Sequence, residues 1–154
     1  MFGKSAISVE LFDKIAEILP RGKSILEFGS GEGTRELIKN WKVISVEHNE
    51  KYVIPGHQTV KAAIDSVTGW YHKERVKTAL NLGPYGLIII DGPPGNKRGN
   101  FQFELFDDVD CPVIFDDVNR WIDRSIMQVF CRKFDYTYDI FEGQEKDFAL
   151  CTKN

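Results

Sequence analysis

The sequence predicts one α/β domain built around a doubly wound, mostly parallel β-sheet, and three observations point to this fold class. Short apolar segments alternate with amphipathic segments of helical spacing along the chain. The segment Leu87–Ile90 is apolar without interruption, as expected for a central strand buried on both faces. The last two strand-like segments are joined by a turn at Gly143 that is short enough only for an antiparallel hairpin.

Seven segments are predicted to be strands. Five are short, apolar and bounded by Gly, Pro, Asp or Asn, and two more flank the final turn. In chain order they are Ser24–Phe28, Val43–Val46, Thr59–Ile64, Leu87–Ile90, Pro112–Phe115, Tyr136–Phe141 and Lys146–Thr152. Since domains commonly contain about 100–200 residues, we expect one domain over 1–154.

Helices are predicted between these strands. The first begins after Ser8, a plausible N-cap, and ends before Pro20. The others are expected over 33–41, 66–82, 100–108 and 119–134. The side chains expected to face inward from the two longest are Val67, Trp70, Tyr71, Val76 and Leu80, and then Trp121, Ile122, Ile126, Val129 and Phe130.

The composition excludes several classes of protein. A net charge of −3 is too small and of the wrong sign for a general nucleic-acid or anionic-membrane binder. No run of about 18 apolar residues could cross a membrane, and the first residues lack an apolar signal core. The cysteines Cys111, Cys131 and Cys151 form no metal or disulfide pattern and suit a reducing compartment. We therefore expect a cytoplasmic protein.

A glycine-rich stretch follows the first predicted strand and opens a helix. It reads Glu27-Phe28-Gly29-Ser30-Gly31-Glu32-Gly33-Thr34. Glycines there let the backbone turn tightly and approach a ligand, and the start of the helix offers free N–H groups. The dinucleotide fingerprint would require a glycine at position 34, which is Thr34 here.

This E-x-G-x-G-x-G pattern resembles the first motif of class I S-adenosylmethionine-dependent methyltransferases, and the resemblance extends over almost the whole chain. It implies a seven-stranded sheet of order 3-2-1-4-5-7-6 and S-adenosylmethionine as the cofactor. It also implies that Glu27 helps to hold the amino group of the cofactor. The loop around its methionine end would contain Gly29, Ser30, Gly31, Gly33 and Thr34.

Further cofactor contacts are expected at the ends of the second and third strands. Glu47 follows Glu27 by 20 residues and could accept hydrogen bonds from both ribose hydroxyls, although an exposed strand-end carboxylate is the alternative. His48 could pack near the adenine or be an ordinary loop residue. The resemblance places Ile64 and Asp65 beside the adenine, whereas Asp65 could equally cap the following helix.

The loop after the fourth strand is expected to face the glycine-rich loop across a crevice, where a methyl acceptor would sit. Its candidate acid–base or acceptor-binding groups are Asp91, Lys97 and Arg98. Arg98 would suit an acceptor carboxylate or phosphate, while the alternative for both cations is a solubilising loop tip. The segment D-G-P-P-G lacks the aromatic residue that nucleic-acid amino methyltransferases carry here, which argues against a nucleic-acid acceptor.

Two adjacent carboxylates, Asp116 and Asp117, end the fifth strand at the same sheet edge as Asp91. Unpaired, they would repel each other unless solvent or a cation screened them. The three resemble the metal ligands of catechol-type O-methyltransferases and would suit Mg²⁺ or Ca²⁺. The chain departs from that family by Pro94 at the position of its lysine and by the missing cap helices.

The function expected from these motifs is methyl transfer from S-adenosylmethionine to a small-molecule or sugar-like acceptor, with O-methylation favoured. One alternative is a module that binds S-adenosylmethionine or S-adenosylhomocysteine without transferring a methyl group. A dinucleotide-dependent oxidoreductase is disfavoured by Thr34 and by the terminal hairpin. Acceptor recognition is left to Gly92–Asn100, to the first helix, or to the neighbouring subunit of a homodimer.

Overall fold

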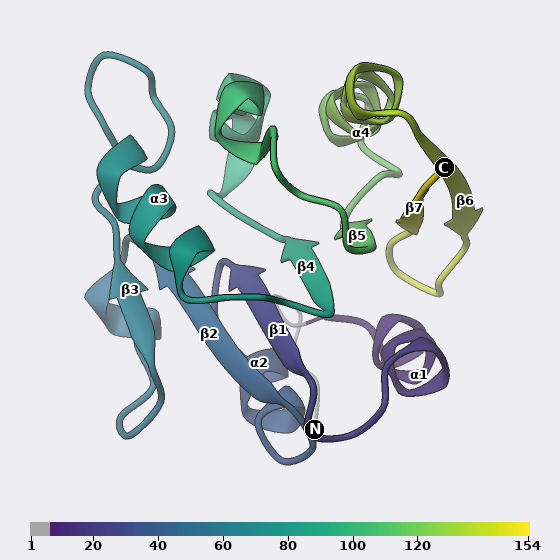
Figure 1. Cartoon of the computed structure of the whole chain (residues 1–154), viewed down its shortest axis with the longest axis horizontal. Coiled ribbons are helices and arrows are strands. Elements are labelled where there is room, and N and C mark those ends of the chain that lie inside the picture. The colour runs from purple at the N-terminus through teal and green to yellow at the C-terminus, as the bar shows by residue number, and fades with distance from the viewer. Residues whose placement is uncertain (1–6) are drawn as a thin grey trace.

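The structure, a computed structural model, describes residues 7–154 and contains one seven-stranded sheet (Figure 1). Its strand order is β3-β2-β1-β4-β5-β7-β6, which confirms the predicted fold class and order. The strands are β1 (Ser24–Phe28), β2 (Lys42–Glu47), β3 (Thr59–Lys61), β4 (Leu87–Ile90), β5 (Val113–Phe115), β6 (Tyr136–Phe141) and β7 (Phe148–Lys153).

Strand direction and strand order together create a crevice at one edge of the sheet. Strands β1 to β5 run parallel, and β7 runs antiparallel to both β5 and β6. The chain order reverses between β1 and β4, which are hydrogen-bonded neighbours. Loops leaving the carboxyl ends of these two strands diverge to opposite faces of the sheet, so a crevice opens between them.

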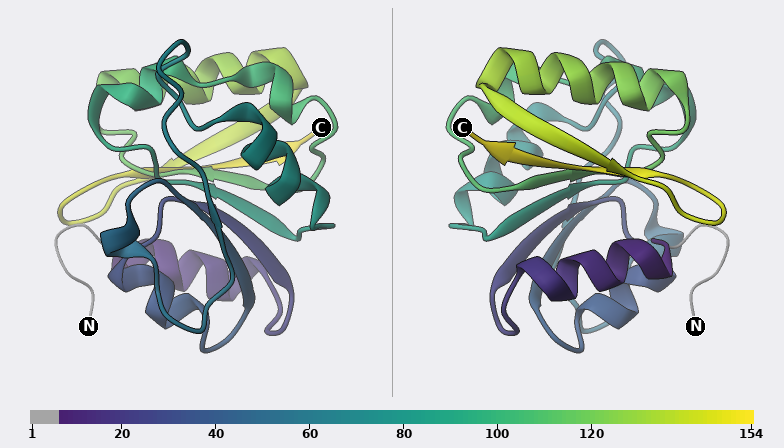
Figure 2. Two further views of the ribbon diagram at one scale, coloured as in Figure 1. Left: turned by 90° about the vertical axis from the view of Figure 1, so that its left-hand side faces the viewer. Right: turned by 90° about the vertical axis from the view of Figure 1, so that its right-hand side faces the viewer.

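Helices cover both faces of the sheet (Figure 2). On one face lie α1 (Val9–Ile18) and α2 (Glu32–Leu37), and on the other lie α3 (Lys73–Asn81) and α4 (Trp121–Phe134). Because alternate strand residues point to opposite faces, Ile25 packs in the first core, whereas Leu26 and Phe28 pack in the second. Within residues 7–154, no helix is long and apolar enough to span a membrane.

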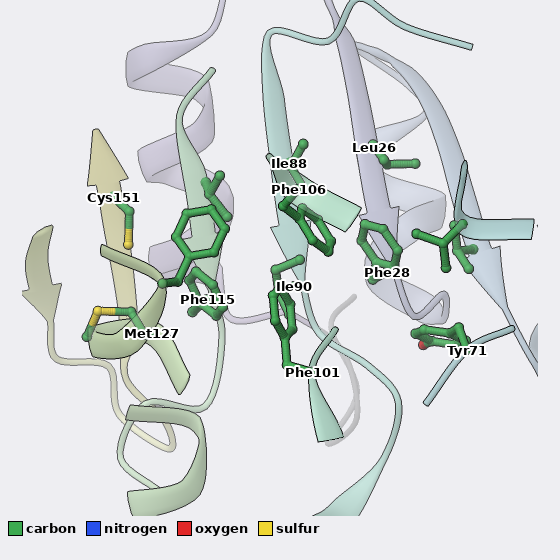
Figure 3. Close-up of a cluster of buried hydrophobic side chains, with 14 of the residues drawn as sticks. Leu26, Phe28, Tyr71, Ile88, Ile90, Phe101, Phe106, Phe115, Met127 and Cys151 are labelled. Carbon is green, nitrogen blue, oxygen red and sulfur yellow. The ribbon is translucent and has the colours of Figure 1, made fainter. Parts of the chain in front are cut away.

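The core beneath α3 and α4 is rich in aromatic side chains. The rings of Phe101 and Phe106 stack with centroids 4.8 Å apart, and Phe28 lies 5.7 Å from Phe106. Figure 3 shows Tyr71 at one end of this core and Met127 with Cys151 at the other. The buried aromatic rings support the β1 and β4 ends from below, which fixes the floor of the crevice.

The predicted helix over 66–82 was wrong in its first seven residues. The carboxylate of Asp65 accepts hydrogen bonds from the backbone N–H groups of Val67 and Thr68, at 2.7 and 3.2 Å. This closes a tight turn in place of a helical turn, so Asp65 does not cap α3. Val67, expected to face inward, is 91% exposed. Tyr71 is buried as expected, but it lies in the loop before α3.

The other predicted helices agree with the structure to different degrees, and the strand predicted over Thr59–Ile64 ends at Lys61. The first helix has the expected N-cap, because the side chain of Ser8 accepts a hydrogen bond from the N–H of Leu11. The helix predicted over 33–41 ends at Leu37. In place of a helix over 100–108 the chain forms two 3₁₀ turns, η2 (Gly95–Asn100) and η3 (Phe103–Phe106); a third, η1 (Glu50–Tyr52), follows β2.

The long helix α4 confirms the predicted span but corrects its inward face. Trp121 is 76% exposed, and Val129 is also exposed. Phe130 is buried as predicted and Ile126 packs partly buried against the core, but the rest of the buried stripe consists of Asp123, Met127, Cys131 and Phe134. Trp121 stands in the first turn, ahead of the part of the helix that the sheet covers.

Candidate functional site

A crevice of about 370 Å³ lies at the carboxyl ends of β1, β2 and β4. Its walls come from the loop Gly29–Glu32, the segment Lys51–Ile54 after β2, and the loop that begins at Asp91. Lys146, in the turn between β6 and β7, closes one side. The position is the one at which doubly wound sheets bind ligands.

Two glycines let the loops of β1 and β4 approach each other closely. Gly29 has φ +92°, and a Cβ atom there would lie 2.6 Å from the carbonyl oxygen of Asp91. A Cβ atom on Gly92 would collide with the hydroxyl of Tyr71. By contrast, a Cβ atom on Gly31 would meet only open space, because the loop there faces the crevice. The backbone therefore forms an open cradle that a ligand can approach.

The carboxylate of Glu47 joins the two walls of this cradle. One oxygen accepts a hydrogen bond from the N–H of Ser30 at 2.9 Å. The other accepts from the N–H groups of His48 and Asn49, both at 2.8 Å. Glu47 is buried but lines the crevice, and the oxygen that accepts from Ser30 has a second lone pair, whereas the other oxygen already accepts two hydrogen bonds. The side chain is therefore placed to accept a further hydrogen bond from a hydroxyl of a ligand.

Glu27 lies behind the loop and is not among the residues that line the crevice. The hydroxyl of Thr34 donates to its carboxylate at 2.5 Å and accepts from the N–H of Gly31 at 3.0 Å. Ser45 donates a second hydrogen bond at 3.1 Å. Burial raises the pKa of Glu27 to about 7 in spite of these hydrogen bonds. In the structure, Glu27 shapes the glycine-rich loop from below.

The hydroxyl of Tyr71 is buried at the floor of the crevice and has no hydrogen-bond partner among residues 7–154. Burial raises the pKa of Tyr71 well above its usual value. A buried hydroxyl without a partner is costly, so this group is a candidate to hydrogen-bond a ligand in the crevice. The ring of His48 packs edge-on against Tyr71, and its Nδ1 atom lies 3.1 Å from the carboxylate of Glu47.

The structure does not bring all predicted cofactor residues to the crevice. Ile64 forms an isolated bridge with Tyr71, and neither Ile64 nor Asp65 lines the cavity. The apolar wall on that side comes from Val53 and Ile54, which the sequence analysis missed. No local motif marks these two residues, because only the path of the chain after β2 carries them there.

Arg98 is 8% exposed, so its interpretation as a solubilising loop tip was wrong. Its guanidinium donates to the carboxylates of Asp91, Asp117 and Asp123 at 2.8–3.0 Å. It also donates to the carbonyl oxygens of Asp91 and Pro93. All five N–H groups are used within the protein, which leaves none for an acceptor. Lys97 is exposed and does not line the crevice.

The predicted metal ligands do come together, since oxygens of Asp91, Asp116 and Asp117 lie within 4.8 Å of one another. However, the Nζ atom of Lys146 lies 2.7 Å from Asp116, and Arg98 pairs with the other two carboxylates. All three carboxylates are therefore already paired with cations of the chain. A divalent ion would have to compete with Lys146 and Arg98 for these oxygens.

The same ion pairs set the charge of this cluster. Burial raises the pKa of Asp91 well above its usual value, and the nearby charge of Asp116 raises it further, against the opposing effect of Arg98. Burial also raises the pKa of Asp116, which Lys146 opposes. For Lys146, burial lowers the pKa, but the charges of Asp91 and Asp116 outweigh this and raise it. Lys146 is therefore an ammonium ion at neutral pH.

Comparisons with known proteins agree with this geometry at the level of the fold. No model of a known protein family and no curated protein sequence matches the chain. A candidate caffeoyl-CoA O-methyltransferase from Staphylococcus aureus superposes with a TM-score of 0.63 at 14% identity, over 94% of this chain and 82% of that one.

Two other solved structures are similar. The ribosomal protein L11 methylase of Lactobacillus delbrueckii subsp. bulgaricus has a TM-score of 0.63 at 12% identity, over 93% of this chain and 76% of that one. A Podospora anserina methyltransferase with bound S-adenosylhomocysteine has a TM-score of 0.51 at 12% identity, over 86% of this chain and 72% of that one. The chain therefore has the fold of class I S-adenosylmethionine-dependent methyltransferases.

Proposed function

We propose that the protein is an S-adenosylmethionine-dependent methyltransferase that methylates an oxygen of a small-molecule or sugar-like acceptor. The observation that carries this proposal is the crevice in which a glycine cradle faces the buried carboxylate of Glu47. A dinucleotide would need the same strand ends, but Thr34 stands where its fingerprint requires a third glycine.

The residues that line the crevice fit the cofactor in three parts. The open backbone around Gly31 receives the methionine end, and the remaining lone pair of the Glu47 carboxylate accepts a hydrogen bond from a ribose hydroxyl. Val53 and Ile54 offer an apolar wall to the adenine, and the unpartnered hydroxyl of Tyr71 finds its hydrogen-bond partner in the ligand. When bound, the cofactor supplies an electrophilic methyl group, while the protein supplies alignment.

Asp91 is the residue that we assign to proton transfer. An acceptor hydroxyl loses its proton when its oxygen takes the methyl group, and Asp91 lies in the crevice wall at the end of β4. Its raised pKa brings the carboxyl group closer to the range in which a general base works near neutral pH. The guanidinium of Arg98, 3.0 Å away, holds this carboxylate in position.

A binding module without transfer activity is the second candidate. The internal pairing of Arg98 favours it, because that residue has no donor left to hold an acceptor. Such a module would use the same cradle and Glu47 but would release the cofactor unchanged.

Thermal unfolding with added ligand tests cofactor binding, which the methyltransferase and the binding module have in common. S-adenosylhomocysteine should raise the melting temperature, since a ligand at a hundredfold excess over its Kd adds about 2.7 kcal/mol of stability, whereas NAD should not. Glu47→Ala should weaken this binding about ten- to hundredfold, because hydrogen bonds to a charged group contribute roughly 1.5–3 kcal/mol. Glu50→Ala, an exposed carboxylate three positions on, is the matched control.

Methyl transfer then separates the two candidates. Incubation with isotopically labelled S-adenosylmethionine and a pool of small metabolites should place the label on an acceptor, as read by mass spectrometry. Binding without any labelled product would favour the binding module. Absence of a thermal shift with S-adenosylhomocysteine would contradict both.

A further inference from the structure

Two cationic side chains stand on the acceptor side of the crevice. Lys146 lies in the turn between β6 and β7, and Arg120 directly precedes α4; both line the cavity with Asp91 and Asp117. Strand β5 adjoins β4 on the side away from β2, so this group lies across the crevice from Glu47. The ligand parts assigned to the cofactor therefore leave this end free for a second molecule.

Lys146 is fixed by an ion pair, but its ammonium group retains unused hydrogen-bond donors. Its Nζ atom lies 2.7 Å from Asp116 and 3.9 Å from Asp117, and its side chain is only 14% exposed. An ammonium group has three N–H donors, and within residues 7–154 only the one to Asp116 is used in a hydrogen bond. The remaining donors belong to a side chain that lines the crevice, so they are available to a ligand.

Arg120 resembles Lys146 in this respect and differs from Arg98. Its Nε atom donates to Asp123 at 2.9 Å, and its side chain is 43% exposed at the rim. Every N–H group of the Arg98 guanidinium donates to an atom of the protein, so this side chain only holds the carboxylates in position. Lys146 and Arg120 are thus the two cations of this cluster that can reach an acceptor.

Most of the negative charge of the cluster is compensated within the protein itself. Four carboxylates are paired with three cationic side chains of the same chain. A divalent ion would have to displace Lys146 from Asp116, at the cost of that buried ion pair.

We propose that Lys146, assisted by Arg120, binds an anionic group of the methyl acceptor and takes the place of a metal ion in orienting it. The acceptor class is therefore a small molecule with a carboxylate or a phosphate beside the hydroxyl that is methylated. This inference rests on the proposed function for the identity of the second molecule. The anion site itself follows from the placement of Lys146 and Arg120.

Titration with inorganic phosphate and with acetate, followed by amide NMR of the protein saturated with S-adenosylhomocysteine, tests the site. Either anion should shift the amide resonances of Lys146 and Arg120. The anion that binds with the higher affinity identifies the charged group, phosphate or carboxylate, that the site prefers. Lys146→Gln should weaken binding about tenfold, the loss of one charged contact of roughly 1.4 kcal/mol, and Lys146→Arg should retain most of it. Lys77→Gln, an exposed lysine on α3, makes the same charge change elsewhere and should have no effect.

Lys146→Gln leaves Asp116 buried without its partner, so the double variant Lys146→Gln/Asp116→Asn is prepared as well, because it keeps a neutral hydrogen-bonded pair. It should fold and bind anions as weakly as the single variant. Anion binding that is insensitive to both variants would overturn the proposal, as would Mg²⁺ binding to the wild-type protein that requires Asp116. If S-adenosylhomocysteine does not bind, the same titration of the free protein still tests the anion site, so the two failures are distinguishable.

Discussion

The buried carboxyl group of Glu27, which supports the glycine-rich loop, makes the stability of the protein depend on pH. Its pKa of about 7 in the folded protein exceeds the value of 4.5 for a free side chain. The folded state therefore holds this proton more tightly than the unfolded state. The contribution of Glu27 to the free energy of unfolding is therefore greatest below pH 4.5, and it decreases as the pH rises towards 7.

Replacing Glu27 by Gln should remove that dependence. The difference between the two pKa values corresponds to about 3 kcal/mol, so the wild-type protein should lose roughly that amount relative to Glu27→Gln between pH 4.5 and pH 8. Urea unfolding at several pH values measures the difference in unfolding free energy between the two proteins. The titration of all other groups is the same in both proteins and therefore cancels in this difference. Parallel stability curves for the two proteins would contradict the assignment.

The hydroxyl of Tyr71 has opposite consequences for stability and for binding. Without a ligand it is buried and unpartnered, so Tyr71→Phe should leave the free energy of unfolding unchanged or raise it by about 1 kcal/mol. The same change should weaken S-adenosylhomocysteine binding, because the ligand loses a hydrogen bond. Calorimetry and urea unfolding together test this pair of effects; reduced stability with unchanged affinity would refute the role.

At the scale of secondary structure elements, the contact between the β1 and β4 loops is the feature that the site depends on most. Gly29→Ala should cost more than 2 kcal/mol, since φ is +92° and the new Cβ atom would collide with the carbonyl oxygen of Asp91. Gly22→Ala is the matched control, because Gly22 also has a positive φ but has open space around it. Equal losses in the two variants, measured by thermal unfolding, would show that the loop contact contributes nothing.

Most elements were predictable from local pattern, and the errors share a cause. The central strands and α4 have strong periodicity, so their existence followed from the sequence. The segment 66–72 has apolar residues at helical spacing, yet Asp65 closes a turn there, and Trp70 and Tyr71 enter the core from a loop. Apolar spacing predicted the burial of Trp70 and Tyr71 but failed at Val67, and it cannot tell which backbone conformation delivers a side chain to the core.

At the scale of the whole molecule, the strand order decides which residues share the crevice. The order places β5 and the β6–β7 turn next to β4, so Lys146 reaches Asp116 across 30 positions of sequence. This contact makes the carboxylate cluster part of an internal ion-pair network. Our proposal accordingly assigns acceptor recognition to Lys146 and Arg120.

The sequence by itself determined the fold class, the glycine cradle and the position of Glu47, because these depend on periodicity and on residues that follow one another along one strand and its loop. Only the tertiary structure decided the surroundings of Arg98, Tyr71 and Lys146. Each of these depends on which side chains from distant elements surround it, and burial among such neighbours sets hydrogen-bond partners and pKa values. The residues adjacent in sequence do not reveal which distant side chains these will be.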